Sequence, residues 1–279
     1  MIVHTPAELA AARGALSGTV ALVPTMGALH EGHRSLIRAA REIADHVVVS
    51  VFVNPLQFGE KADLDRYPRT LEADAAICAE EGVALVFAPS AADMYPREPV
   101  VTVSAGEMGT VVEGASRPGH FDGVLTVVTK LFGLVRPDSA LFGQKDAQQL
   151  AVIRRLSEDL NLGVRIVACP TVREADGLAL SSRNRFLSPD ERVTAVALSR
   201  ALFAGRDAVE LGPAGVLAAA GAVLDAAAKA EPPLDRDYLV LADSVTFSPV
   251  TAGHSGPAVL AVAARVGETR LIDNLPLEF

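Results

Sequence analysis

Residues 47–53, VVVSVFV, constrain the fold more than any other part of the sequence. They form a run of β-branched and apolar side chains, which is typical of a strand covered on both faces in the middle of a parallel sheet. Shorter strand patterns occur at 19–23, 84–88, 139–143 and 164–168, and helical patterns separate them at 32–44, 70–81, 123–135 and 146–160. The alternation predicts an α/β fold with a doubly wound parallel sheet. Residues 54–68 are expected to form a long loop.

The pattern changes near Cys169 and Pro170, where a polar, arginine-rich loop begins. Two alanine-rich helices are expected after it, at 189–208 and 213–229, followed by strands at 237–243, 258–266 and 269–274. Helices followed by consecutive strands indicate a smaller α+β domain. We therefore expect two domains, 1–169 and 170–279, the second acting as a lid.

Composition argues against a nucleic-acid-binding, membrane-spanning or secreted protein. The net charge is −9, so a nucleic-acid partner is not expected, because binding phosphate backbones needs a basic surface. No uninterrupted apolar stretch approaches the roughly 18 residues that span a bilayer. The N-terminus has no basic segment before an apolar one, and Thr5 to Glu8 instead form a helix start with a capping box. The two cysteines, Cys78 and Cys169, are interpreted as core residues. A cytoplasmic protein with no membrane partner is expected.

Three loops of unusual composition follow three of the expected strands: PTMGALHEGH after 19–23, NPLQFG after 47–53, and GQKD after 139–143. Ligands of open parallel sheets bind at the carboxyl ends of the strands, where these loops meet. The loops are therefore expected to line one pocket.

Met26 to His33, MGALHEGH, is the sharpest motif. Gly27 and Gly32 allow close approach of the backbone, and His30 and His33 share one face at a helix start. A helix N-terminus offers unpaired N–H groups and a partial positive charge. This His-x-Gly-His pattern predicts a cradle for phosphate.

Other interpretations of this motif remain open from the residues alone. A zinc protease needs His-Glu-x-x-His, and the spacing here is one residue short. Another metal site needs a third ligand, and the other four histidines form no obvious cluster. The histidines could also be simply solvated. Neither a Walker A sequence nor a Gly-x-Gly-x-x-Gly motif occurs in the chain.

Two further stretches carry cationic groups. Ser181, Ser182 and Arg183 suit phosphate oxygens, although an ordinary solvated loop would look the same. Lys145 and Asp146 lie at a strand end and helix start, where Lys145 could contact a phosphate or the pair could simply cap the helix.

Taken in order, several segments resemble the pantothenate synthetases, or pantoate–β-alanine ligases. The matching segments are PTMGALHEGH, VSVFVNPLQFG, DLDRYPRTLEAD, EGASRPGHFDGVLTVVTKLF, LFGQKDAQQL and LSSRNRFL. The resemblance implies a Rossmann-like nucleotidyltransferase fold and a cytoplasmic ligase of pantothenate biosynthesis, which supplies a precursor of coenzyme A. ATP and (R)-pantoate would give pantoyl adenylate and pyrophosphate, and β-alanine would then displace AMP.

The resemblance also implies roles for individual residues. His33 and His30 would act on the phosphates, with His33 at the position that the family treats as proton donor, and Lys145 and Arg183 would assist them. Gln57 would bind pantoate and β-alanine, Gln149 would bind pantoate, and Asn54 is a further pocket candidate. The implied ATP-binding residues are Met26, Gly27, Ala28, Leu29, His30, Glu31, Gly32, His33, Gly143, Gln144, Lys145, Asp146, Val172, Leu180, Ser181, Ser182 and Arg183.

Magnesium is expected to arrive mainly on the ATP phosphates. Ala73 stands where the family often carries an acidic residue, so no protein ligand of the ion is assigned. The resemblance also implies a homodimer. Two other functions remain open: another nucleotidyltransferase with a phosphorylated acceptor, and a nucleotide-binding protein without catalysis. The amide-rich NPLQF and GQKDAQQ segments argue against the first, and Lys145 with Ser181 to Arg183 argues against the second.

Overall fold

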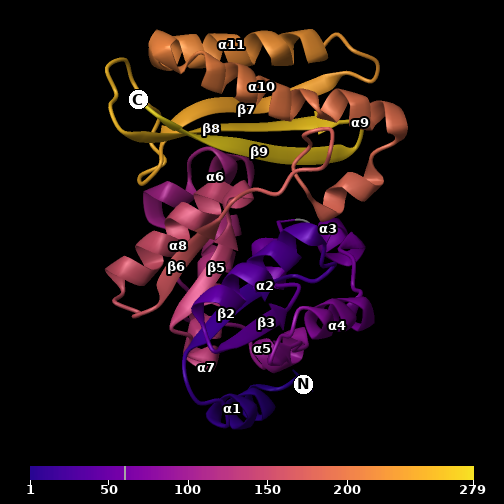
Figure 1. Ribbon diagram of the computed structural model, residues 1–279, viewed down its shortest axis with the longest axis vertical. Helices are drawn as coiled ribbons and strands as arrows, with labels where there is room; N and C mark the ends of the chain where they lie inside the picture. Colours follow the sequence, from indigo (N-terminus) through magenta and orange to yellow (C-terminus); the bar gives the residue numbers. More distant parts are fainter. Residues whose placement is uncertain (60) are drawn as a thin grey trace. The chain divides into compact units, whose positions relative to one another are not determined.

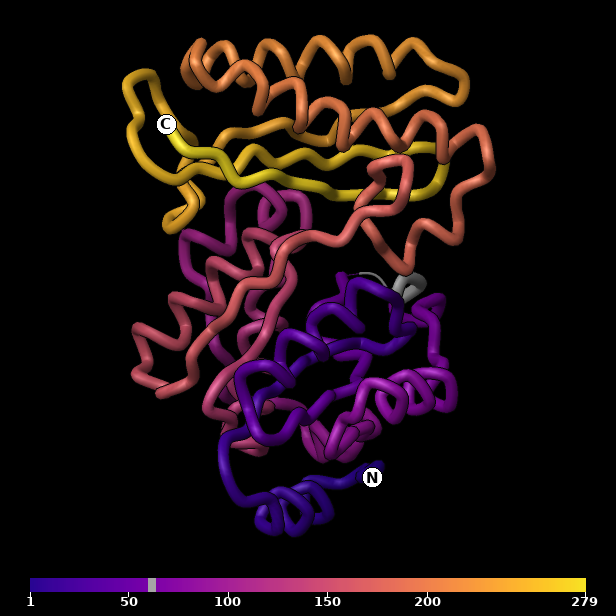
Figure 2. The backbone as a smooth tube through the Cα atoms, in the orientation of Figure 1, coloured from indigo at the N-terminus to yellow at the C-terminus, as the bar shows by residue number. Residues whose placement is uncertain are grey.

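The computed structural model describes residues 1–59 and 61–279. The chain forms two compact units (Figure 2), of which the first comprises Met1–Gly143 and Val152–Cys169 and the second comprises Gln144–Ala151 and Pro170–Phe279. The chain therefore enters the second unit twice, first for a short segment that begins at Gln144.

The first unit is built on a parallel six-stranded sheet with the order β1-β4-β3-β2-β5-β6 (Figure 1). Its strands are β1 Ile2–Val3, β2 Val20–Thr25, β3 His46–Val51, β4 Leu85–Phe87, β5 Ser139–Gly143 and β6 Arg165–Cys169. The predicted parallel sheet is thus confirmed. Strand β1 was not predicted, because two residues are too few to show a period.

Helices connect these strands. They are α1 Pro6–Gly14, α2 Glu31–Ile43, α3 Lys61–Arg66, α4 Leu71–Glu80, α5 Ala91–Met94, α6 Glu113–Ser116, α7 His120–Val135 and α8 Ala147–Asp159, the last shared between the units. The Thr5 capping box of α1 is present as predicted. The expected loop 54–68 was partly wrong, since it contains the 3-10 turn η1 Pro55–Gln57 and helix α3, while Glu60 lies outside the described residues.

The apolar side of α2 packs on the sheet. Its buried residues Leu36, Ile37 and Ala40 join the core formed by strands β2 and β3. Cys78 and Cys169 belong to the same core, and burial raises the pKa of the Cys78 thiol to about 11. Both cysteines are therefore core residues, as the sequence indicates.

The strand order places a topological switch beside β2. The chain runs from β2 to β3 and β4 on one side, and β5 then pairs with the opposite edge of β2. Ligands of doubly wound sheets bind at such a point. The loop after Thr25 begins there, and strands β3 and β5 end at the same edge at Val51 and Gly143.

The second unit has an antiparallel sheet, β7-β8-β9, with helices α10 and α11 along one face (Figure 1). Its elements are β7 Leu234–Asp243, β8 Pro257–Val266, β9 Thr269–Glu278, α9 Pro189–Ala195, α10 Ala197–Asp207 and α11 Gly212–Ala227. The expected single helix at 189–208 is divided at Val196. The smaller α+β fold predicted for this part is confirmed.

Helix α11 lies in an apolar stretch that Glu210 and Asp225 interrupt, so the expectation of no uninterrupted apolar span stands. The stretch Val209–Ala227 is long and apolar enough to cross a membrane by length and composition alone. In this structure Val216, Ala220 and Leu224, spaced one turn apart, are buried in the core of the second unit. That spacing is typical of a helix that covers a sheet, with alanine making the rest of its surface apolar.

Two glycines of α7 give a matched test of how this helix packs. A Cβ at Gly123 would lie 2.2 Å from the carbonyl oxygen of Leu56, whereas a Cβ at Gly133 would meet no described atom within 4 Å. We expect Gly123→Ala to lower the free energy of unfolding by about 1–3 kcal/mol through overpacking. Gly133→Ala should leave it unchanged or raise it by up to about 1 kcal/mol. Chemical denaturation would check both, and equal effects would contradict the packing described here.

Candidate active site

The loop after β2 turns the chain sharply from the sheet into α2. Gly27 has a φ of 86° and Ala28 a φ of 52°, so two successive residues occupy the left-handed region. The carboxylate of Asp74, on α4, accepts hydrogen bonds from the N–H groups of Ala28 (3.1 Å) and Leu29 (2.8 Å). Asp74 is only 1% exposed. This buried carboxylate therefore holds the turn in a conformation that alanine would not adopt by itself.

Helix α2 begins with a capping box made by two histidines. The Nδ1 atom of His30 accepts a hydrogen bond from the N–H of Gly32 (3.2 Å), and the Nδ1 atom of His33 accepts one from the N–H of His30 (3.3 Å). A ring nitrogen that accepts a hydrogen bond carries no proton, so each neutral ring carries its proton on Nε2. The ring centroids lie 4.2 Å apart. The helix start thus presents two neighbouring imidazoles of the same tautomer.

Several main-chain N–H groups of the loop and the helix start bond to side chains, which the sequence did not indicate. The N–H groups of Gly27, Ala28, Leu29, His30 and Gly32 all bond to side chains of the first unit. Their acceptors are Thr25, Asp74 and the two histidines. Side-chain capping satisfies donors that the sequence alone leaves unassigned. The imidazole Nε2 atoms consequently supply donors that these main-chain groups do not.

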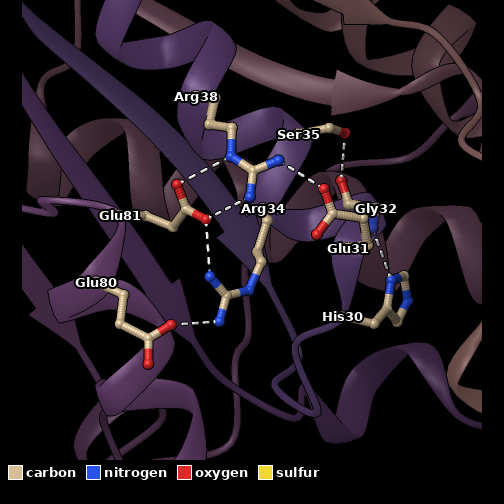
Figure 3. Close-up of polar contacts among 8 residues, drawn as sticks. All are labelled: His30, Glu31, Gly32, Arg34, Ser35, Arg38, Glu80 and Glu81. Carbon is tan, nitrogen blue, oxygen red and sulfur yellow. Dashed lines mark hydrogen bonds and ion pairs between the residues drawn. The ribbon is translucent and has the colours of Figure 1, made fainter.

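A group of ion pairs ties α2 to the end of α4 (Figure 3). Arg34 contacts Glu80 and Glu81, while Arg38 contacts Glu81 and Glu31. Three hydrogen bonds reach the Glu81 carboxylate, one from Arg34 at 2.9 Å and two from Arg38 at 2.7 Å and 3.1 Å. Hydrogen bonds from Arg38, and then from Arg34, lower the pKa of Glu81. Since Asp74 also lies on α4, these pairs hold its helix against the one that carries the histidines.

The NPLQF loop forms a second polar cluster in the first unit. Asn54 donates to the Oε1 atom of Gln57 (3.1 Å) and to the carbonyl of Gly123 (3.0 Å), and its own oxygen accepts from Tyr95 (3.0 Å). Gln57 donates in turn to the sulfur of Met26 (3.1 Å). The structure therefore brings Met26, Asn54 and Gln57 together. It also fixes which end of the Gln57 amide donates and which end accepts.

The main chain of Gln57 is held as firmly as its side chain. Its carbonyl oxygen lies 2.9 Å from the Nδ1 atom of His120 and accepts from Arg117 at 3.3 Å. Burial raises the pKa of Tyr95 to about 12, so its hydroxyl remains a donor to Asn54 at neutral pH. Tyr95, Arg117 and His120 thus support Gln57 from outside the NPLQF loop.

The second unit carries the other predicted residues except Gly143. Gln144 to Asp146 form the 3-10 turn η3, in which the Lys145 ammonium lies 3.8 Å from the Asp146 carboxylate. Gln149 is half-buried on the first turn of α8, and Gly143 belongs to the first unit as the last residue of β5. The Lys145 side chain is 19% exposed, so it is largely enclosed but still reachable by a ligand.

A short hairpin brings Val172 and Leu180 together, because the N–H of Leu180 donates to the Val172 carbonyl at 3.0 Å. Ser181 then caps the 3-10 turn η4, Ser182–Phe186, by accepting from the N–H of Arg183. Asn184 bonds to Glu174, whose pKa is lowered by hydrogen bonds from Arg192. The segment with Ser182 and Arg183 is therefore anchored within its own unit.

Comparison with known proteins identifies the family. The family model described as pantoate-beta-alanine ligase matches residues 1–276. The pantothenate synthetase of Thermobifida fusca is 62% identical over 99% of this chain and 95% of the relative. The pantothenate synthetase of Nocardioides sp. is 60% identical over 99% of this chain and 85% of the relative. The chain belongs to the pantoate–β-alanine ligase family.

Solved members of this family have the same fold. A pantothenate synthetase from Thermus thermophilus superimposes with a TM-score of 0.91 at 49% identity, over 98% of both chains. A pantoate–β-alanine ligase from Francisella tularensis, complexed with β,γ-ATP and β-alanine, gives a TM-score of 0.80 at 32% identity, over 99% of this chain and 97% of that one. The predicted fold class and family resemblance are both confirmed.

Sequence reasoning missed several residues that hold this family's motifs in place. Asp74, Tyr95 and His120 carry no spacing signal of their own, because they act from elements distant in sequence. Asp74 could have been suspected from its position within DLDRYPRTLEAD, a segment that resembles the family. His120 could have been suspected in the same way from EGASRPGHFDGVLTVVTKLF, whereas Tyr95 lies in none of these segments and could be found only from the fold.

Substitutions at His30 should separate helix capping from phosphate binding. His30→Asn keeps a side-chain oxygen at a position where asparagine caps well, but removes the imidazole. We expect its thermal midpoint to equal or exceed that of the unchanged protein, with turnover lowered by at least about 10-fold. His30→Ala should lose both the helix cap and the imidazole, so turnover should fall and the free energy of unfolding should be lower by about 1 kcal/mol. Normal turnover by His30→Asn would contradict a role for the ring.

The Glu81 network should make stability depend on pH in a defined direction. Because the pKa of Glu81 lies below its ordinary value of 4.5, its ionised form stabilises the folded protein above that pH. The contribution is lost as pH falls through the lowered pKa. The thermal midpoint of Glu81→Gln should therefore lie below that of the unchanged protein at pH 7, and this difference should shrink as the pH falls below the ordinary value.

Glu80→Gln is the matched control, since Glu80 is 62% exposed and contacts Arg34 alone among the described residues. It should shift the midpoint much less at every pH. A Glu81→Gln deficit that stays constant from neutral pH down to strongly acidic pH would rule out this account.

Proposed function

We propose that the chain joins (R)-pantoate to β-alanine at the expense of ATP, producing pantothenate, AMP and pyrophosphate. Membership of the pantoate–β-alanine ligase family supports this reaction. One structural observation carries the proposal. Gln57, with its amide fixed by Asn54, contacts Met26 at the start of the loop whose His30 and His33 are both held with Nδ1 as acceptor. An oriented amide for an organic acid and donors for phosphate thus occur in one unit.

In this proposal the loop from Met26 to His33 binds ATP. The Nε2–H groups of His30 and His33 donate to phosphate oxygens, and this stabilisation increases as charge develops on the leaving pyrophosphate. A general base is not needed in the first step, because the carboxylate of pantoate is already ionised near neutral pH. The histidines therefore act as donors and not as bases.

Gln57 and Gln149 are the proposed ligands of pantoate. An amide suits the hydroxyl groups of pantoate, since it donates and accepts without adding charge. Both ends of the Asn54 amide are bonded within the protein, so we assign Asn54 to holding Gln57 in orientation. Gln57 also contributes to the β-alanine site in this proposal.

The second unit contributes the cationic groups. Lys145 and Arg183, with the hydroxyl groups of Ser181 and Ser182, offset charge on the phosphates. Gly143 to Asp146, Val172 and Leu180 complete the proposed ATP-binding segments. We infer that residues 170–279 act as a lid domain that closes over the nucleotide.

The reaction has two chemical steps. A carboxylate oxygen of pantoate attacks the α-phosphorus of ATP, and the bond from that phosphorus to the bridging oxygen breaks to release pyrophosphate. The amine of β-alanine, after losing one proton from its ammonium form, attacks the acyl carbon of pantoyl adenylate. The carbon–oxygen bond to AMP then breaks. Adenylation makes this possible because AMP is a far better leaving group than oxide.

Magnesium enters the proposal as part of the substrate, on the ATP phosphates. Among the side chains that the structure describes, which do not include those of residues 60–63, no three His, Cys, Asp or Glu side chains gather as metal ligands. Asp74, the acidic residue beside Ala73, uses both carboxylate oxygens for main-chain N–H groups. These residues do not fit a resident magnesium site, and no step is assigned to one.

The proposal includes a cytoplasmic location and a homodimer, both taken from the family resemblance. The solution mass measured by light scattering would test the dimer. A mass of one chain across the working concentration range would remove that part of the proposal and leave the reaction unaffected.

The reaction is tested by following pyrophosphate released from Mg-ATP, first with (R)-pantoate alone and then with β-alanine added. We expect a limited pantoate-dependent release that becomes sustained turnover with AMP and pantothenate as products. Pantoate-independent release would indicate another nucleotidyltransferase. ATP binding without any release would indicate a binding protein.

Lys145→Ala should lower turnover by roughly 100-fold or more, because a positioned charge on the phosphates is lost. The thermal midpoint should stay close to that of the unchanged protein. Lys229→Ala is the matched control, since Lys229 is exposed at the end of α11. If Lys145→Ala turned over at the rate of this control, the role assigned to Lys145 would be wrong.

A further inference from the structure

Strand β9 contributes a buried amide to the segment that contains Lys145. Asn274 is 5% exposed, and its Nδ2 atom donates to the carbonyl oxygens of Gln144 (2.9 Å) and Lys145 (2.6 Å). A side-chain amide has two N–H donors, and here both bond to successive carbonyls of one turn. All three residues belong to the second unit.

Asn274 is itself held from both sides. Its N–H donates to the carboxylate of Asp273 (2.8 Å), and its carbonyl accepts from Arg173 (3.3 Å). Arg173 and Asp273 form a two-pronged ion pair with distances of 2.6 Å and 3.0 Å. Asp273 is 3% exposed, and the Arg173 guanidinium stacks on the ring of Phe203 at 5.2 Å. A buried fork of this kind permits little variation in geometry.

Arg173 also connects its ion pair with Asp273 to the hairpin that contains Val172 and Leu180. Arg173 follows Val172 directly, pairs with Ala179 across the hairpin and donates to the carbonyl of Gly177 (3.1 Å). The segments that contain Val172 and Lys145 are therefore joined through Arg173, Asp273 and Asn274. Neither Asp273 nor Asn274 is among the predicted site residues, and neither bears a group that the chemistry requires.

We propose that Asn274 is a positioning residue for the ligase reaction, fixing the main chain at Lys145 so that its ammonium meets the ATP phosphates. This inference rests on the proposed role of Lys145. The turn η3 has three residues and leads directly into α8, so the direction of the Lys145 side chain depends on how its carbonyls are held. Asn274 supplies that restraint from a strand of the antiparallel sheet.

The test is a double-substitution cycle between Asn274 and Lys145, measured as kcat and kcat/KM for ATP. Asn274→Ala alone should lower kcat by between about 10- and 100-fold, as small misplacements of catalytic groups do. KM for ATP should change less, because the interaction of the Lys145 ammonium with the phosphates strengthens as charge develops on them in the transition state. In the Lys145→Ala background, Asn274→Ala should add less than about 2-fold, since the group it positions is already absent.

Ser199→Ala is the structural control. Ser199 is a buried hydroxyl of α10 in the same unit, 1% exposed, and donates to the carbonyl of Val196. It should lower the thermal midpoint without changing kcat in either background. If Asn274→Ala does not fold, Asn274→Ser, which keeps one donor in a smaller side chain, replaces it in the same cycle.

The outcomes separate the two proposals. If Lys145→Ala leaves kcat unchanged, the assigned role of Lys145 fails. If Lys145→Ala lowers kcat but Asn274→Ala does not, or if the two losses multiply, then Asn274 does not act through Lys145 and the inference is overturned. Losses that fail to multiply, with the control unaffected, would establish it.

Discussion

The site depends first on the hydrogen bonds from Ala28 and Leu29 to the buried carboxylate of Asp74. A chain that leaves a parallel strand and enters a helix within a few residues must turn tightly, and here Gly27 and Ala28 both do so at positive φ. An alanine in that region is strained, and such strain persists only where surrounding bonds compensate for it. The carboxylate supplies that compensation, and the start of α2 follows from it.

Holding the loop in this way changes how it can meet an anion. A phosphate loop of the usual kind presents its main-chain N–H groups, whereas here five of them bond to side chains of the protein. Two of the acceptors are the Nδ1 atoms of His30 and His33, so satisfying the main chain also sets the tautomer of both rings. The His-x-Gly-His spacing therefore works as a helix cap and as a pair of oriented donors.

The fold could be predicted from the sequence because its longer strands are continuous runs of apolar and β-branched residues. Residues 47–53 and 139–143 show their burial directly, and strand β5 was predicted with its observed bounds. What could not be predicted lies in short elements and distant contacts. Strand β1 and helix α3 are too short to show a period, and the split at Val196 breaks a continuous alanine-rich pattern. Asp74 and Asn274 act on residues more than forty positions away, which no local pattern reveals.

The two segments proposed to bind the nucleotide share one construction, although they belong to different units. Each is a short turn between a strand and a helix, and each is restrained by a buried side chain from an element remote in sequence: Asp74 accepts from the first, and Asn274 donates to the second. One side chain accepts and the other donates because the first turn directs its N–H groups at the buried side chain, whereas the second turn directs its carbonyl oxygens at it. In each case the atoms proposed to meet the substrate differ from those that restrain the main chain. Rigidity of the main chain and availability of the reacting groups are thus supplied by different atoms, as preorganised electrostatic catalysis requires.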